Sequence, residues 1–216
     1  MTQTPEIYLF HAFLRGISPM IWRRLLVRSD QSVADLHYAL QLAFGWSDSH
    51  LNTFRIHGRD FGVYHVGGSV FDENANKIRL ADFQFRAGER FLYEYDFGDQ
   101  WQHQVRLERI LPFQPDRTYP VCIGGKRSAP PEDCGGVWAF QQRRDEAPSR
   151  GEELLEQIAE CAREQDITAL RDLAEEIPVI RTWLTLDKFD RRKVNCRLRQ
   201  YAVGDAEWRR PQEGAE

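Results

Sequence analysis

The amino-acid sequence predicts an α+β fold, with an antiparallel sheet, one early packed helix and a helical C-terminal third. Three observations support this prediction. Strand-like apolar patterns occupy most of the first 136 residues, one amphipathic helix interrupts them, and helical patterns fill the rest. We expect a single domain at residues 1–205, which is sheet-rich over 5–136 and helical over 137–205. Residues 206–216 are expected to be a disordered tail.

The first elements are a hairpin and a helix. Two apolar and aromatic runs, 7–14 and 21–27, flank a turn and predict paired strands. Ser32 is the expected N-cap of the following helix, with Asp35 as its capping-box partner, and Gly45 ends it. The helix is predicted because apolar residues and one core histidine recur at helical spacing: Val33, Leu36, His37, Leu40, Ala43 and Phe44.

The later elements divide into strands and helices. Strands are predicted at 51–57, 61–66, 90–96 and 101–110, and residues 77–83 lead into the third of these. Residues 112–136 contain five prolines and four glycines, so we expect no regular structure there. Helices are predicted at residues 137–144, 152–163, 168–177 and 190–201.

Composition limits the classes of function. The formal net charge of −4 gives the whole chain no electrostatic attraction to nucleic acid or acidic membranes. No apolar run of 18 residues exists, and four cysteines without a signal peptide predict free thiols in the cytoplasm. Residues 152–176 hold nine acids and two arginines, whereas residues 181–210 hold nine bases and four acids. This asymmetry indicates either a partner surface or two solvated helical faces that attract each other.

Two polar stretches are the candidate site. Asp96, Asp99 and His103 surround a predicted hairpin tip, and His50 or the Glu132-Asp133 turn are candidates to join them around Zn, Mn or Fe. The catalytic candidates for general acid–base chemistry are Asp96, Asp99, His103, Glu132 and Asp133. The alternative is structural, because aspartate commonly caps its own turn and His103 shares a predicted face with Trp101 and Val105.

The same stretches resemble a known family. Residues 93–103 read Tyr-x-Tyr-Asp-Phe-Gly-Asp-x-Trp-x-His, and residues 130–136 read Pro-Pro-Glu-Asp-Cys-Gly-Gly. Together with Trp22-Arg23-Arg24 and Phe189-Asp190, they resemble the plasmid pRiA4b ORF-3-like family. The resemblance implies an α+β fold and an association with mobile genetic elements. Some relatives carry a resolvase label, but this chain lacks the residue sets of serine and tyrosine recombinases.

Three functions follow as hypotheses. The first is a cytoplasmic binding or accessory protein that uses a groove between the Asp96–Asp99 tip and the 130–136 turn. The second is a metal-dependent, phosphodiesterase-like hydrolase that uses Asp96, Asp99 and His103. The third is a protein-interaction module formed by the charge-split helices. A nucleic-acid partner is a further candidate, through phosphate contacts from Arg191, Arg192, Lys193, Arg197 and Arg199 with Trp183 and Trp208 for base stacking.

Overall fold

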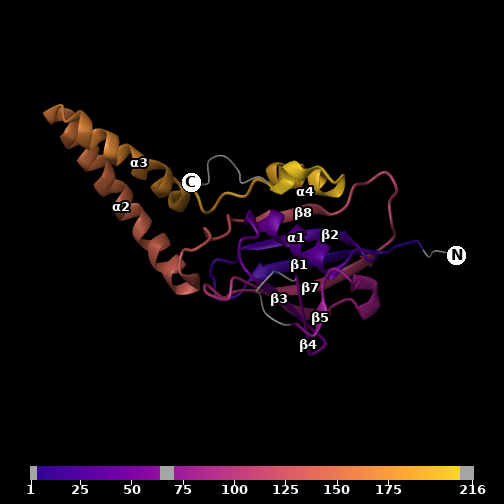
Figure 1. The fold of residues 1–216 in the computed structure, drawn as a ribbon. Helices are drawn as coiled ribbons and strands as arrows, with labels where there is room; N and C mark the ends of the chain where they lie inside the picture. Colours follow the sequence, from indigo (N-terminus) through magenta and orange to yellow (C-terminus); the bar gives the residue numbers. More distant parts are fainter. Residues whose placement is uncertain (1–3, 64–70, 210–216) are drawn as a thin grey trace.

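A sheet of eight strands forms the body of the protein in the computed structural model, which describes residues 4–63 and 71–209. The strand order is β5-β4-β3-β6-β7-β1-β2-β8, and all neighbours over the described residues are antiparallel except the β4–β5 pair. Figure 1 shows the sheet with the helices around it. The strands are β1 Ile7–Leu14, β2 Trp22–Arg28, β3 Asn52–Ile56, β4 Arg59–Gly62, β5 Glu73–Asn74, β6 Arg90–Tyr95, β7 Trp101–Leu111 and β8 Val121–Lys126.

Helix α1, Val33–Phe44, confirms the prediction at both of its ends. Ser32 accepts a hydrogen bond from the Asp35 backbone, the Asp35 side chain accepts one in return, and Gly45 ends the helix in the left-handed region at φ 86°. Nearly all of its residues are buried, because the helix packs against the sheet and under a later helix. His37 is fully buried and lies within hydrogen-bond distance of the Tyr93 hydroxyl and of Asp48.

Two predictions for the sheet need correction. Residues 112–136 were expected to be irregular, but β8 forms there and pairs with β2 in antiparallel register. The predicted strand 61–66 is realised as β4, which ends at Gly62, and its residues 64–66 lie outside the described ones. Residues 77–83 contain a short 3-10 helix, η1 Leu80–Phe83, before β6.

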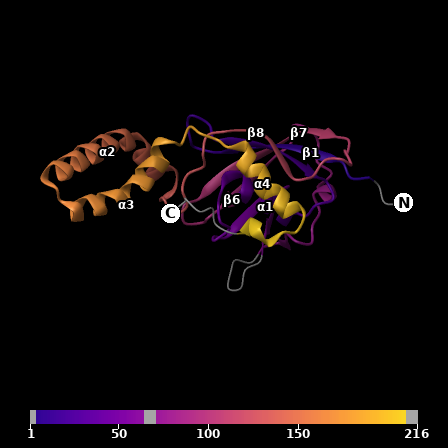
Figure 2. The ribbon, with the colours of Figure 1, turned by 90° about the horizontal axis from the view of Figure 1, so that it is seen from above.

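The C-terminal third is helical, as predicted, but with fewer and longer helices. The two helices expected at 137–144 and 152–163 are one helix, α2 Gly136–Glu164, which continues through Pro148 although a proline removes one helical hydrogen bond. It pairs with α3, Ile167–Leu184, and the two project away from the sheet as a hairpin (Figures 1 and 2). Helix α4, Arg191–Ala202, returns over β8 and α1.

The first four residues of the expected disordered tail have regular structure. Residues 206–209 form a 3-10 helix, η2 Ala206–Arg209, in which Trp208 is 8% exposed. Trp208 is held there by aromatic contacts with Tyr38 and Tyr201. Residues 210–216 lie outside the described part of the chain. Within the described ranges, none of the helices is both long and apolar enough to cross a membrane.

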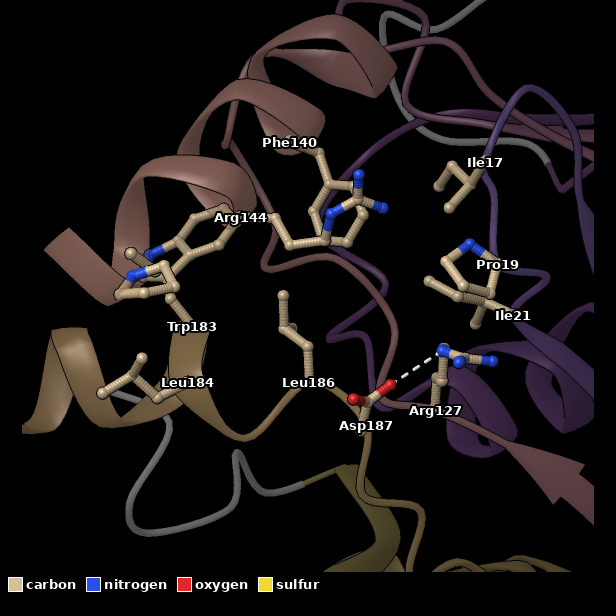
Figure 3. A pocket seen from close by; sticks show the side chains of 12 residues that line it. Ile17, Pro19, Ile21, Arg127, Phe140, Arg144, Trp183, Leu184, Leu186 and Asp187 are labelled. Carbon is tan, nitrogen blue, oxygen red and sulfur yellow. Dashed lines mark ion pairs between the residues drawn. The ribbon is translucent and has the colours of Figure 1, made fainter.

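The hairpin is anchored to the sheet around a small cavity of about 280 Å³ (Figure 3). Apolar residues of the β1–β2 connection face Phe140 of α2 and Trp183 of α3 across it. Arg144 donates a hydrogen bond to the Ser18 carbonyl, and Arg127 forms an ion pair with Asp187. These contacts fix the base of the hairpin on the body.

Candidate functional site

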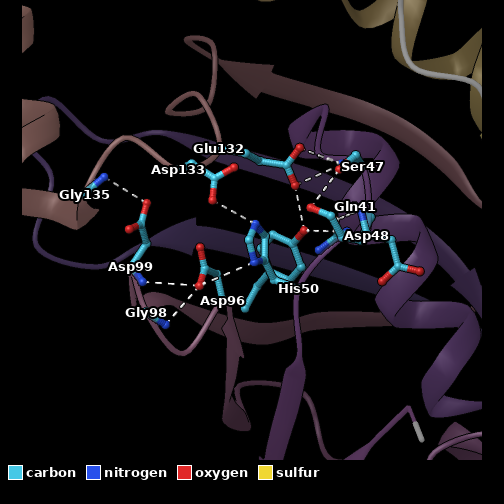
Figure 4. A network of polar contacts seen from close by, with 12 residues as sticks. Gln41, Ser47, Asp48, His50, Asp96, Gly98, Asp99, Glu132, Asp133 and Gly135 are labelled. Carbon is cyan, nitrogen blue, oxygen red and sulfur yellow. Dashed lines mark hydrogen bonds and ion pairs between the residues drawn. The ribbon is translucent and has the colours of Figure 1, made fainter. Parts of the chain in front are cut away.

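Three segments that are distant in the sequence meet at one end of the sheet: residues 45–50 after α1, residues 96–100 at the tip of the β6–β7 hairpin, and residues 130–136 before α2. We call this meeting point the junction (Figure 4). The contacts are direct, because Trp46 donates from Nε1 to the Pro130 carbonyl at 2.9 Å and Asp99 contacts Gly135. The two polar stretches singled out in the sequence therefore do meet in space.

The two aspartates of the hairpin tip have structural tasks. Asp96 is buried and has a φ of 58°, and its Oδ1 accepts hydrogen bonds from the backbone N–H groups of Gly98 at 2.9 Å and Asp99 at 3.3 Å. Asp99 Oδ2 accepts from the Gly135 N–H at 3.1 Å. A Cβ on Gly136 would lie 2.7 Å from the Asp99 carbonyl oxygen, so the turn approaches the tip as closely as only glycine permits.

Glu132 connects the turn to the other two segments. Its carboxylate accepts hydrogen bonds from the Ser47 N–H at 3.1 and 3.0 Å and from the Tyr95 hydroxyl at 2.6 Å. The Tyr95 hydroxyl in turn accepts from the Ser49 N–H at 3.1 Å. Burial, and then the adjacent Glu132 carboxylate, raise the pKa of Tyr95 far above its ordinary value, so the phenol stays a donor.

The structure brings three of the predicted site residues together. His50 Nε2 lies 3.1 Å from Asp133 Oδ1, and His50 Nδ1 lies 3.8 Å from Asp96 Oδ1. Over the described parts of the chain, these three residues form the group of potential metal ligands whose ligand atoms all lie within 4.8 Å of one another. Asp133 is mostly exposed, whereas Asp96 is buried, so the group opens to solvent on the side of the turn.

His103 lies elsewhere. It is fully buried, its Nδ1 lies 3.1 Å from the Trp101 carbonyl oxygen, and its ring packs edge-on against Phe44 and Trp46. Burial lowers the pKa of His103 to about 3. The structure therefore does not gather Asp96, Asp99 and His103 around one point, because position 103 faces the core on the inward side of β7.

Two of the predicted nucleic-acid residues have hydrogen-bond acceptors within the protein. Arg191 donates to the Ile123 carbonyl, and Arg197 donates to the Trp208 carbonyl with its pKa lowered by burial. Arg192, Lys193 and Arg199 are exposed. Of the predicted stacking residues, Trp208 is buried, and Trp183 is half-buried and packs against Phe140.

The predicted groove between the hairpin tip and the 130–136 turn is not open, but a groove lies on another side of the same turn. The hairpin tip contacts the turn directly, whereas a groove of about 590 Å³ separates the turn from the N-terminal end of α4. Its walls are residues 42–46, residues 128–133, and residues 188–190, 193 and 194 with Thr182, and Arg23 lines it as well. We refer to it below as the groove.

Arg23 is the groove residue that the sequence did not single out as functional. It is 2% exposed, and it donates hydrogen bonds to the carbonyls of Ala43, Trp22 and Lys126 at 2.7, 2.8 and 3.1 Å. Its guanidinium carbon lies 4.9 Å from the centre of the Phe44 ring and 4.1 Å from that of Phe189. Burial lowers the pKa of Arg23 to about 10, so it remains a cation at neutral pH. The sequence did contain a signal: Arg23 alternates with Leu25 and Val27 along β2, so it lies on the same inward face as these two residues.

Known proteins resemble the chain over most of its length. The sequence model of a family described as "Plasmid pRiA4b ORF-3-like protein" matches residues 6–197. "Uncharacterized protein y4hQ" of Sinorhizobium fredii (strain NBRC 101917 / NGR234) is 33% identical over 148 residues, which are 66% of this chain and 76% of that protein. A solved structure, "Protein of Unknown Function MM3350 from Methanosarcina mazei Go1", has a TM-score of 0.62 and 32% identity, and the match covers 89% of this chain and 98% of that one.

Proposed function

We propose a function from the premise that the chain belongs to the plasmid pRiA4b ORF-3-like protein family, which its match over residues 6–197 shows. The protein is an accessory module that binds a small molecule in the groove beside the junction. The plasmid in the family's description supports an association with mobile genetic elements. Four free cysteines support a cytoplasmic setting.

One observation carries this proposal: three of the segments that resemble the family, at residues 22–24, 130–136 and 189–190, contribute residues to the wall of a preformed groove. Glu132 and Trp46 line the groove, and each is held by hydrogen bonds to another segment of the junction. Phe189 lines the opposite wall and packs on Arg23. A volume of about 590 Å³ is within the range of small-molecule sites. Pre-organised walls lower the entropy cost of binding.

A groove-blocking substitution tests the proposal. Thr182 is exposed and lines the groove, so Thr182→Trp would fill part of it, whereas Thr168→Trp places the same side chain near the far end of α3 as a control. Ligand-observed NMR with a library of small organic fragments should find binders to the wild type and to Thr168→Trp that Thr182→Trp does not bind. An absence of binders, or binders that ignore Thr182→Trp, would count against the proposal.

A divalent metal at the junction is a second candidate, because His50, Asp96 and Asp133 place three ligand atoms within 4.8 Å. One imidazole and two carboxylates suit Zn, Mn or Fe. The hydrolase hypothesis would then use this set in place of Asp99 and His103.

Mass spectrometry of untagged protein, reconstituted with each metal in turn, tests the candidate. His50→Asn should lose the metal, and His57→Asn, at an exposed histidine paired with Glu89, should keep it. A wild-type protein that takes up no metal, or equal loss from both variants, would rule it out. A nucleic-acid or protein partner remains a prediction, for which the exposed Arg192, Lys193 and Arg199 are the residues to change.

A further inference from the structure

Arg23 carries a buried charge that no acid of the described residues compensates. Its hydrogen-bond acceptors are three backbone carbonyls, which use Nε and Nη1 and leave Nη2 without a partner among the described residues. The flanking rings of Phe44 and Phe189 supply only partial negative charge. Burying a cation is costly unless it is paired, so an anion placed here would recover part of that cost.

The other charged residues of the groove are acids, which have contacts within the protein, and lysines, which form no ion pair among the described residues. Its acids already have contacts: Glu132 accepts hydrogen bonds from Ser47 and Tyr95, Asp133 Oδ1 lies 3.1 Å from His50 Nε2, and Asp190 accepts hydrogen bonds from the first turn of α4. The exposed ammonium groups of Lys188 and Lys193 form no ion pair within the described residues. The cations of the groove are therefore its available groups.

The packing of Phe189 on Arg23 depends on the absence of a side chain at Gly125. Gly125 of β8 is paired with Arg23 of β2, and a Cβ on Gly125 would lie 2.5 Å from the Phe189 ring and 2.9 Å from Arg23 Cδ. The absent side chain leaves the space in which Phe189 lies over the guanidinium. A single orientation of the guanidinium is thereby fixed before any ligand arrives.

We propose that the groove recognises a small molecule by an anionic oxygen group, a carboxylate or a phosphate, which binds Nη2 of Arg23 and is attracted by Lys188 and Lys193. The inference rests on the proposed function, since it assigns a ligand class to the same groove. A fixed guanidinium suits it because its N–H groups match the geometry of carboxylate and phosphate oxygens. Increasing salt should weaken the binding, since two of the three cations are exposed.

Fluorine NMR titrations of the full-length protein test the ligand class. The probes are 4-fluorobenzoate, 4-fluorophenyl phosphate and the uncharged 4-fluorobenzamide, which has the shape of the benzoate. At least one anion should bind while the benzamide does not, and the tighter anion distinguishes carboxylate from phosphate. Binding of the benzamide as tight as that of the anions, or binding of neither anion, would overturn the inference.

Variants test the assigned residues. Lys188→Gln combined with Lys193→Gln should weaken anion binding about fivefold, as expected for exposed charges, and Lys77→Gln, an exposed lysine outside the groove, should not change it. Arg23→Gln should abolish binding, and the lysine variants keep the test decisive if that variant does not fold. Equal affinities in the lysine double variant and in Lys77→Gln would contradict the assignment.

The two proposals can fail separately. If fragments bind and Thr182→Trp blocks them while neither anion binds, the ligand class is wrong and the groove remains a binding site. If neither fragments nor anions bind the wild type, both proposals are wrong.

Discussion

Asp99 accepts a hydrogen bond from the backbone N–H of Gly135 at 3.1 Å, and this bond joins two segments that are 36 positions apart in the sequence. The tip of a hairpin is thereby attached to the turn that leads into α2. The acid that the sequence marked as a metal ligand is in the structure a connection between segments. Removing the Asp99 side chain should therefore lower the stability of the protein.

Asp99→Ala should destabilise the protein by about 1 kcal/mol, because the Gly135 N–H loses a charged acceptor. For a chain of this size that corresponds to a fall of about 3 °C in melting temperature. Differential scanning calorimetry would measure it, with Asp116→Ala, at an exposed loop position, as the control. Equal melting temperatures of the two variants would show that the contact contributes nothing.

Gly136→Ala should be more harmful than Gly88→Ala. Both glycines have positive φ, 76° and 93°, so both substitutions carry the left-handed backbone cost of about 1–2 kcal/mol. Only at Gly136 would the new Cβ meet a neighbour, the Asp99 carbonyl oxygen at 2.7 Å, whereas Gly88 has nothing within 4 Å. Overpacking adds about 1–3 kcal/mol. Urea unfolding of both variants should show this difference, and equal losses would contradict the close approach.

Gly125→Ala should destabilise the protein by about 1–3 kcal/mol and displace Phe189 from Arg23, because its Cβ would overlap the ring. Gly124→Ala is the matched control, since its Cβ would lie at an ordinary 3.4 Å from the Trp22 ring. Urea unfolding measures the cost, and the methyl and ring signals of NMR spectra report the displacement. A Gly125→Ala protein as stable as Gly124→Ala would argue against the packing described.

His103 should make the protein less stable in acid. Burial lowers the pKa of His103 from its ordinary 6.5 to about 3, so below pH 6.5 the unfolded chain binds a proton that the folded protein does not. Stability is therefore lost as the pH falls from about 6.5 toward 3, and the contribution of this group at pH 5 is about 2 kcal/mol less than at pH 7. Urea unfolding at both pH values measures the slope. His103→Asn should show a smaller slope than the wild type, whatever its absolute stability, and identical slopes would contradict the burial of a neutral imidazole.

Local signals in the sequence predicted local structure well. The ends of α1 were predictable because Ser32, Asp35 and Gly45 act on backbone groups within a few positions. Strand β8 was not, because its partner β2 is far away in the sequence, and its two glycines and the prolines on either side of it resemble a loop. The continuity of α2 through Pro148 also depends on packing against α3, which no local pattern records.

The site was predicted in part for the same reason. The acids and His50 were identified by residue type, and the structure brings His50, Asp96 and Asp133 together. The role of Arg23 was missed because its neighbours Phe44, Gly125 and Phe189 come from three distant segments. The alternation along β2 did place Arg23 on the apolar face of the strand. A cation at such a position is the feature of the sequence that points to a functional role.

The contact between Phe189 and Arg23 also sets an order of assembly during translation. The strand that carries Arg23 leaves the ribosome long before the Phe189 ring that covers it, because the two are far apart in the sequence. Until then, Phe189 cannot cover the guanidinium, and the groove lacks the wall that the start of α4 contributes. A protein truncated before residue 189 should therefore lose the recognition of anions, so ligand binding reports that synthesis has passed α4.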